Sequence, residues 1–190
     1  MKLKDIKPFI MEFKKLELNN LEDILEMEEK MYWQGKEWQK LWQKEARNKF
    51  KELIKDYLIN YPNGCWGLFN TTGELLAAVI FTRLNKVKAI PYFHRFSNYF
   101  ETAGKIIYVQ VFAVKNSESE ENLAEKIYEQ LERVAKHIGG QKVAVLIYSS
   151  FLEEKILNKL GYKIEYNNLQ WEIYPDKFVN CKIYTRTVDQ

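Results

Sequence analysis

The chain has few of the residues that build disulfide frameworks and metal sites. Its 190 residues include two cysteines and two histidines. Cys65 and Cys181 lie far apart and in no metal-type spacing, so we expect two reduced thiols in or near the core. His94 and His137 are too few and too scattered for a metal site. We therefore predict neither a disulfide framework nor a metal centre.

The sequence also has no long apolar run, no internal repeat and no low-complexity tract. No stretch approaches the length of a membrane span, and Met1–Asp5 is not followed by the apolar core of a signal peptide. The hydrophobic fraction of 46% and the charged fraction of 29% are those of an ordinary soluble protein. We expect one domain over residues 1–190, located in the cytoplasm, without a membrane partner.

Neither sign of charge is in large excess. The net charge of +3 comes from 29 basic and 26 acidic residues. The longest basic cluster, Lys2–Lys15, is diluted by Asp5 and Glu12, which indicates a solvated surface. A nucleic-acid-binding face is usually a dense basic cluster, so no nucleic-acid partner is predicted.

The apolar spacing predicts alternating strands and helices. We expect a strand over 9–18, helices from 21 and from about 37, and a hairpin whose strands, 65–69 and 74–84, flank Asn70–Gly73. The run 105–114 is apolar on both faces, which indicates a central strand covered on both sides. A helix over 123–138 and a strand over 142–148 follow.

The last third of the chain predicts a short helix and more strands. Ser150 and Glu153 fit a capping box that opens a helix over 151–160. Strands are expected at 162–166, 169–174 and 181–188. The order β-α-α-β-β-β-α-β-α-β-β(-β) predicts an α/β (α+β) fold with a mixed, mostly antiparallel central sheet flanked by helices.

That order resembles the GNAT superfamily of acetyl-coenzyme-A-dependent N-acetyltransferases. The residues that support the resemblance are "VFAV" at 111–114, the loop that opens the next helix, "VAVLIY" at 143–148 and "LEEKILNKLGYKIEY" at 152–166. The resemblance implies an acetyl group moved from acetyl-coenzyme A to a primary amine, by direct attack in a ternary complex. The implied acceptor is a small molecule or a peptide.

In that family a turn of the form Q/R-x-x-G-x-G/A and the following helix hold the cofactor pyrophosphate. The resemblance places Ser119 at the first position, Asn122 at the first glycine and Ala124 at the second small residue, with Glu120 and Leu123 between them. Only Ala124 fits well. Asparagine tolerates a left-handed backbone, which would let the turn form at Asn122.

Three acids depart from the family pattern at this loop. Glu118, Glu120 and Glu121 place negative charge where the diphosphate would lie, and each charge pair costs up to ~4 kcal/mol at ~4 Å and an effective dielectric constant of about 20. Acids in a first turn also stabilise the helix by roughly 0.3–1 kcal/mol each, and Ser117 with Glu120 fits a capping box. Either use of these residues remains open.

The resemblance also implies the reacting groups. Backbone amides of Phe112, Ala113 and Val114 would contact pantetheine and the thioester, in a V-shaped gap between splayed strands. The resemblance places Tyr108 at the position of the glutamate that serves some family members as the base. The position of the family's usual tyrosine acid is occupied by Leu157, so Tyr148 is the candidate that donates a proton to the thiolate. His94, in the aromatic insert, is a further candidate base.

Aromatic residues suggest an acceptor wall. Trp33, Trp38, Tyr92 and Phe93 could surround a flat or cationic acceptor, or else serve as core or homodimer contacts. Two functions therefore stay open: an N-acetyltransferase, or a catalytically inactive GNAT-like domain that binds another ligand or a protein partner.

Overall fold

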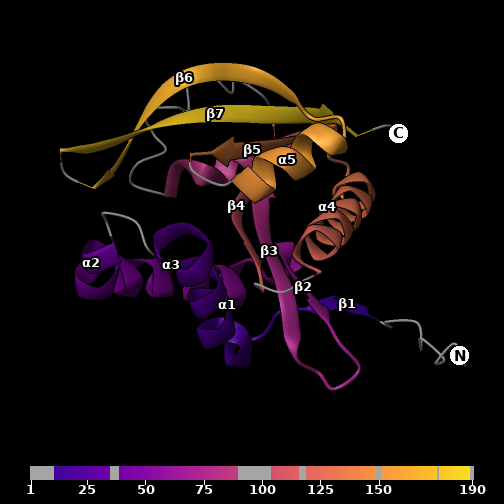
Figure 1. The fold of residues 1–190 in the computed structure, drawn as a ribbon. Helices are drawn as coiled ribbons and strands as arrows, with labels where there is room; N and C mark the ends of the chain where they lie inside the picture. The colour runs from indigo at the N-terminus through magenta and orange to yellow at the C-terminus, as the bar shows by residue number, and fades with distance from the viewer. Residues whose placement is uncertain are drawn as a thin grey trace, which may run out of the picture.

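A seven-stranded sheet with helices on both faces forms the molecule (Figure 1). This computed structural model describes residues 11–34, 39–89, 104–115, 119–148, 151–174 and 176–188. The strands are β1 (Glu12–Lys15), β2 (Cys65–Phe69), β3 (Leu75–Arg83), β4 (Ile106–Val114), β5 (Lys142–Ile147), β6 (Lys163–Tyr174) and β7 (Lys177–Thr187). The helices are α1 (Leu21–Glu28), α2 (Gln39–Leu41), α3 (Arg47–Asn60), α4 (Glu120–His137) and α5 (Phe151–Lys159).

The strand order is β1-β2-β3-β4-β5-β7-β6, and β4–β5 is the one parallel pair among the described strands. The predicted mixed, mostly antiparallel sheet is therefore confirmed, with β4 at its centre. The parallel pair follows from α4, since a helix between two strands returns the chain to the same end of the sheet.

Several element boundaries differ from the prediction, among them the starts of α4 and β7, which lie at Glu120 and Lys177 instead of 123 and 181. The first strand is shorter, because β1 covers only Glu12–Lys15. The helix expected from about residue 37 is interrupted, since a π-helical segment, Trp42–Ala46, separates α2 from α3. The runs 162–166 and 169–174 form a single strand, β6, whose pairing with β7 is irregular around Asn168, a residue with a φ of 57°.

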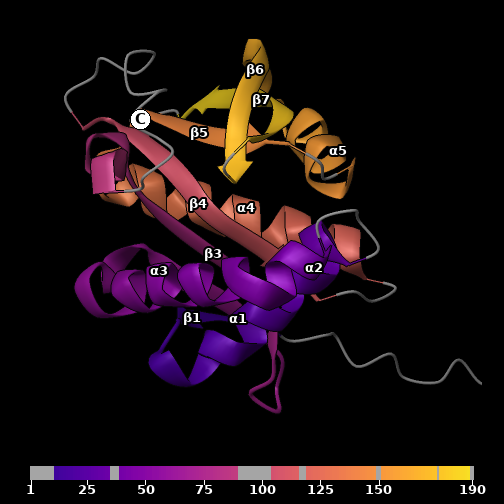
Figure 2. The same cartoon turned by 90° about the vertical axis from the view of Figure 1, so that its left-hand side faces the viewer.

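Two apolar layers hold the helices to the sheet. The layer under α4 and α5 contains Phe112, Leu123, Ile127, Leu131, Ile156 and Leu157. The layer under α1 and α3 contains Ile24, Leu25, Ile54, Leu58, Val111 and Ala113. Figure 2 shows α3 and α4 on opposite sides of β3 and β4. The central strand is thus covered on both faces, as its composition predicts.

A β-bulge divides β4 into two parts. Ile80 of β3 pairs with Val111, and the next residue, Phe81, pairs with Val109, so Gln110 is an extra residue in β4. Val109 lies in the layer under α4, and so does Phe112, three residues later. Because of this one extra residue, the side chains after the bulge lie on the face opposite to the one that strict alternation would give them.

The parallel pairing of β4 with β5 stops at the same bulge. It runs from Ile106 and Lys142 to Val109 and Val145, whereas β4 continues to Val114 and β5 to Ile147. The two strands therefore separate beyond Val109, as the resemblance implies. In Figure 1 the part of the sheet made of β5, β7 and β6 lies above the part that contains β1, β2 and β3.

The remaining composition-based expectations concern cysteines, metals and membranes. Both cysteines are buried and free, which confirms the predicted thiols. Within the described ranges, no three or more His, Cys, Asp and Glu side chains form a group that could hold a metal ion. A search of the same ranges finds no helix with the length and apolarity that a membrane crossing requires.

Candidate functional site

Five side chains, each from a different segment of the chain, meet between the two parts of the sheet. They are Glu28 at the end of α1, Tyr32 in the π-helical segment Glu29–Trp33, Tyr128 on α4, Tyr148 directly after β5 and Glu153 on α5. We call this group the acid–tyrosine cluster. Glu153 and Glu28 are only 3% and 7% exposed, so the cluster contains two buried carboxyl groups.

Glu153 is at the centre of the cluster. The Tyr32 hydroxyl donates a hydrogen bond of 2.6 Å to Oε2 of Glu153, and the Tyr128 hydroxyl donates one to Oε1. The ring of Tyr148 stacks on that of Tyr32, with centroids 5.6 Å apart. Both carboxylate oxygens are therefore held by tyrosines from different helices, which fixes the orientation of the group.

Burial changes the acidity of the whole cluster. Burial raises the pKa of Glu153, the two tyrosine hydrogen bonds offset part of that rise, and the resulting pKa is about 7. Burial and repulsion from Glu153 raise the pKa of Glu28 well above its usual range. The pKa of Tyr148 is also raised, first by burial and then by the two carboxylates. The site therefore holds a carboxyl group that exchanges its proton near neutral pH beside a hydroxyl that keeps its proton.

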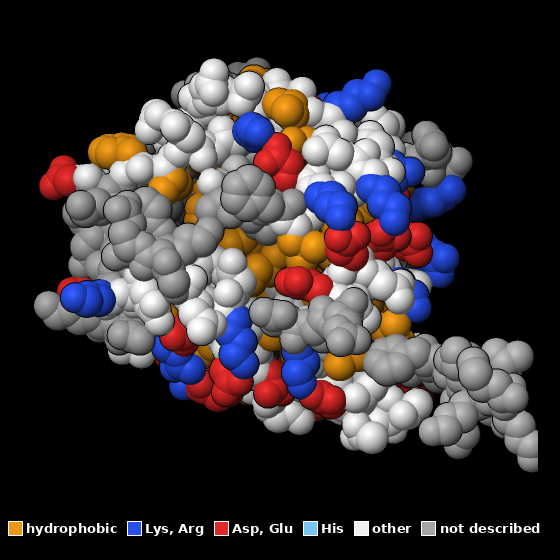
Figure 3. Space-filling model, in the orientation of Figure 1, with side chains coloured by type: hydrophobic (Ala, Val, Ile, Leu, Met, Phe, Trp, Pro, Cys, Tyr) orange, Lys and Arg blue, Asp and Glu red, His pale blue; other side chains and the backbone are white. Residues whose placement is uncertain are grey.

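The cluster bridges the place where β4 and β5 separate. Tyr128 packs on Phe112 of β4, with ring centroids 5.0 Å apart, and Tyr148 continues from the end of β5. The side chains of the cluster thus extend from the end of β5 to β4 at the point where the two strands separate. Seen from the side of Figure 1, hydrophobic side chains gather between the upper and lower halves of the molecule, with carboxylates beside them (Figure 3).

The first turn of α4 is the position that the resemblance assigns to the pyrophosphate. Ser119 precedes the helix, and its carbonyl accepts the N–H of Leu123 at 3.0 Å. The side chains of Leu123 and Ala124 are buried in the core, and the N–H of Leu123 is used within the helix, so the N–H groups of the first turn that remain for a ligand are those of Glu120, Glu121 and Asn122. Asn122 lies within the helix and has no left-handed backbone, so the turn expected there is wrong. Glu120 and Glu121, which precede Asn122, favour a helix that begins at Glu120 instead of at the predicted residue 123.

The two described acids of this turn differ in their surroundings. Glu121 is exposed and forms an ion pair with Lys155 of α5, which lowers its pKa. Glu120 is partly buried, and burial together with repulsion from Glu121 raises its pKa. Lys155 thus offsets one of the two charges, while Glu118 lies outside the described residues.

The residues present fit an acyl-coenzyme A on two observations. A cation, Lys155, lies beside the start of α4, where the backbone N–H groups of a first turn attract anions. Next to the separation of β4 and β5, the side-chain nitrogen of Gln110 is fully buried and meets no hydrogen-bond acceptor among the residues that the structure describes. A thioester arm between the strands would bring carbonyl oxygens to this donor.

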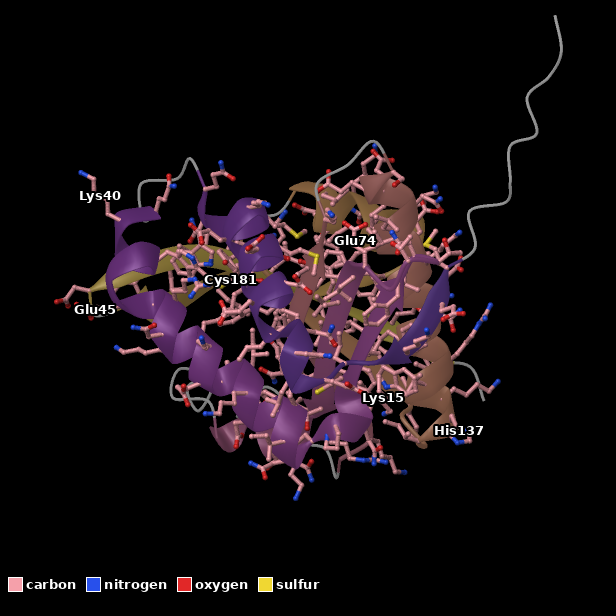
Figure 4. The ribbon with its side chains drawn as sticks, turned by 90° about the horizontal axis from the view of Figure 1, so that it is seen from below. Lys15, Lys40, Glu45, Glu74, His137 and Cys181 are labelled. Atoms are coloured by element: carbon pink, nitrogen blue, oxygen red, sulfur yellow. The ribbon has the colours of Figure 1, made fainter. Side chains whose placement is uncertain are left out.

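The other predicted site residues lie apart from the cluster or outside the described ranges. Tyr108 is buried with Ile106 and Leu169, and burial raises its pKa, so it keeps its proton near neutral pH. Trp33 is half-buried and stacks on the buried Trp42, with centroids 4.7 Å apart. The candidate residues that lie outside the described residues are His94, Trp38, Tyr92 and Phe93. In Figure 4 the remaining histidine, His137, projects outward near the end of α4.

Comparison with solved structures identifies the fold. The C-terminal condensation domain of Ebony, in complex with beta-alanyl-dopamine, superposes with a TM-score of 0.69 at 14% identity, covering 95% of this chain and 100% of that one. A polyamine N-acetyltransferase of Drosophila melanogaster that forms N-acetylagmatine gives 0.62 at 14% identity, covering 94% and 100%. The putative acetyltransferase yncA of Salmonella typhimurium, with acetyl-CoA, gives 0.59 at 13% identity, covering 95% of each chain.

No family model and no curated protein matches the sequence. The similarity is therefore one of structure, and it shows that the chain has the GNAT fold.

Proposed function

We propose that this chain, which has the GNAT fold, moves an acetyl group from acetyl-coenzyme A to a primary amine by direct attack in a ternary complex. The observation that supports this most strongly is Glu153, a buried carboxyl with a pKa of about 7 that lies where β4 and β5 separate. A group with this pKa is close to half-ionised at neutral pH, which suits it to remove a proton from an ammonium group.

Glu153 is the proposed general base. An amine must lose a proton before its nitrogen can attack, and the buried carboxylate accepts that proton. Tyr128 and Tyr32 hold its two oxygens in place. The amine reaches Oε2 when its N–H replaces the Tyr32 hydroxyl as donor, so the π-helical segment that carries Tyr32 has to shift. Segments of this type often occur at functional sites.

Glu28 and Tyr148 are the other titratable groups beside Glu153. Burial and repulsion from Glu153 raise the pKa of Glu28 well above its usual range, so this carboxyl favours its neutral form and leaves the negative charge to Glu153. The Tyr148 hydroxyl keeps its proton because burial and both carboxylates raise its pKa. It is the proposed acid that donates a proton to the departing sulfur, as the sequence predicts.

The remaining machinery holds the acyl donor. Bound acetyl-coenzyme A supplies an acetyl group activated as a thioester. The first turn of α4, from Ser119 to Ala124, and the Lys155 ammonium would hold its diphosphate, and the backbone of Phe112, Ala113 and Val114 would hold its thioester arm. The proposed acceptor is a small molecule or a peptide with a primary amine. Neighbours that form N-acetylagmatine or contain an acylated dopamine support the small-molecule alternative.

One observation favours the second function, a catalytically inactive GNAT-like domain. Both oxygens of Glu153 accept hydrogen bonds from residues of the chain itself, and a network satisfied in this way can serve packing alone. In that case the protein would neither bind coenzyme A nor transfer an acetyl group.

Thermal unfolding with coenzyme A separates the two functions. At a ligand concentration 100 times the dissociation constant, binding adds about 2.7 kcal/mol to the free energy of unfolding, which raises the Tm by several degrees. Millimolar coenzyme A should produce this rise, and acetyl-coenzyme A with agmatine should then release free thiol. Absence of any Tm change would exclude the transferase and favour the inactive domain.

A further inference from the structure

The β-bulge in β4 places an amide side chain at the point where the two strands separate. Gln110 is the extra residue between Val109 and Val111, and Val109 is the last residue of β4 that pairs with β5. Bulges of this kind are frequent beside active sites, where they re-aim a side chain. Gln110 is therefore the first residue of β4 with no strand partner on the β5 side.

The amide nitrogen of Gln110 is fully buried, and within the described part of the chain it has no hydrogen-bond partner. A buried N–H donor that bonds neither to protein nor to water costs folding free energy, and native proteins contain few such groups. Each one calls for a reason, such as an acceptor supplied by a ligand. Among the described residues, Nε1 of Trp42 is another buried side-chain donor without a partner, and it does not lie on β4.

We propose that the Gln110 amide donates a hydrogen bond to a carbonyl oxygen of the thioester-bearing arm of the acyl donor, and so positions the donor against Glu153. This inference rests on the proposed function. The chemistry that matches the donor is a neutral carbonyl oxygen, either of the acyl thioester or of an amide in the pantetheine arm. The Gln110 side chain makes this contact, which adds to any hydrogen bonds that the backbone of β4 makes with the acyl donor.

A methionine at position 110 tests the proposal without leaving a cavity. Gln110→Met keeps the length of the side chain and removes its donor. The free protein should be as stable as the original or gain about 2–4 °C in Tm, since an unbonded polar group is gone. Affinity for acetyl-coenzyme A, measured by titration calorimetry, should fall about 5- to 10-fold. Gln110→Leu is the second variant if the first does not fold.

Coenzyme A without its acetyl group identifies the carbonyl. If only acetyl-coenzyme A loses affinity in the variant, the acceptor is the thioester carbonyl. If both lose affinity equally, the acceptor is a pantetheine amide. Unchanged affinity for both would overturn the role of Gln110. Failure of the original protein to bind either ligand is a different result, because it would remove the transferase function itself.

Discussion

Two pairs of acidic residues in this molecule differ in how deeply they are buried. Glu120 and Glu121 are at the start of α4, where an ion pair with Lys155 lowers the pKa of the exposed Glu121, whereas partial burial raises that of Glu120. Glu28 and Glu153 are buried, and burial raises the pKa of both, that of Glu153 to about 7. The first pair is suited to begin a helix, whereas the second contains a carboxyl group, Glu153, that is suited to exchange protons near neutral pH. Burial, rather than residue type, makes the difference.

The largest effect is expected from the buried pair. Glu153→Gln keeps the size of the side chain but cannot accept a proton, so acetyl transfer should fall about 10²- to 10⁴-fold in kcat. The measurement is steady-state release of thiol from acetyl-coenzyme A. Coenzyme A affinity should change little, because Glu153 acts on the acceptor.

The adjacent residue on α5 provides the control for this variant. Glu154 forms an ion pair with Lys182 on β7 and accepts a hydrogen bond from Tyr184, away from the cluster. Glu154→Gln should retain the original rate within about twofold, in line with the small contribution of exposed ion pairs. Equal activity of Glu153→Gln and Glu154→Gln would disprove the general-base role.

The buried pair should also make stability depend on pH. The folded-state pKa of Glu153, about 7, lies above its ordinary value of 4.5, so the folded protein favours the protonated form. The stability that this provides is complete below about pH 4.5 and is lost as the pH rises through 7, on the order of 3 kcal/mol in total. Urea unfolding at several pH values between 4.5 and 8 measures the loss.

Glu153→Gln should make this pH dependence shallower, and Glu28 should account for what remains because its pKa is raised for the same reason. A stability that increases from pH 5 to 8 in the original protein would mean that the cluster is ionised and solvated, contrary to the structure.

The exposed pair should give the smallest effect. Glu120→Gln removes a partly buried charge beside the proposed diphosphate site and should tighten coenzyme A binding about two- to fivefold. Glu121→Gln should change binding less, since its charge is exposed to solvent and screened by salt. Calorimetry of the two variants at low salt provides the comparison. A larger gain from Glu121→Gln would show that its pairing with Lys155 holds that cation away from the ligand.

The sequence predicts the fold well because the fold depends on local patterns. The two-sided apolar composition of 105–114 indicates the central strand, and the stripe from Leu123 to Ile138 indicates α4; both are confirmed. The bulge at Gln110 could not be predicted, since it depends on the register with β3. The union of the runs 162–166 and 169–174 in β6 depends likewise on pairing with β7.

The sequence points to only part of the candidate site. The position of Tyr148 after a buried strand predicts a role as an acid, which stays a prediction, whereas the sequence pattern around Glu153 predicts only a helix cap. A signal for the carboxyl groups does exist. Glu153 occupies the same helical stripe as Ile156, Leu157 and Leu160, at spacings of three, four and seven. Glu28 stands seven residues after Leu21 in the stripe of α1. A carboxylate on an apolar stripe predicts a buried acid.

No comparable sequence pattern indicates the tyrosines that hydrogen-bond to Glu153. Tyr32 and Tyr128 are 121 and 25 residues away from Glu153 in the chain, and only the tertiary fold brings their hydroxyls to its oxygens. The roles proposed for His94, Trp38, Tyr92 and Phe93 stay predictions, because those residues lie outside the described ranges.

The extra residue in β4 also sets which face each later side chain of the strand takes. If Gln110 paired with β3 as an ordinary strand residue, strict alternation after Val109 would turn Phe112 from the α4 side to the α1 side, and Val111 would make the opposite exchange. A bulky ring would then meet a position built for a smaller side chain. Loss of the bulge without loss of the residue would therefore disturb both cores together, whereas a hairpin tip such as Asn70–Gly73 is the kind of site where an extra residue is tolerated.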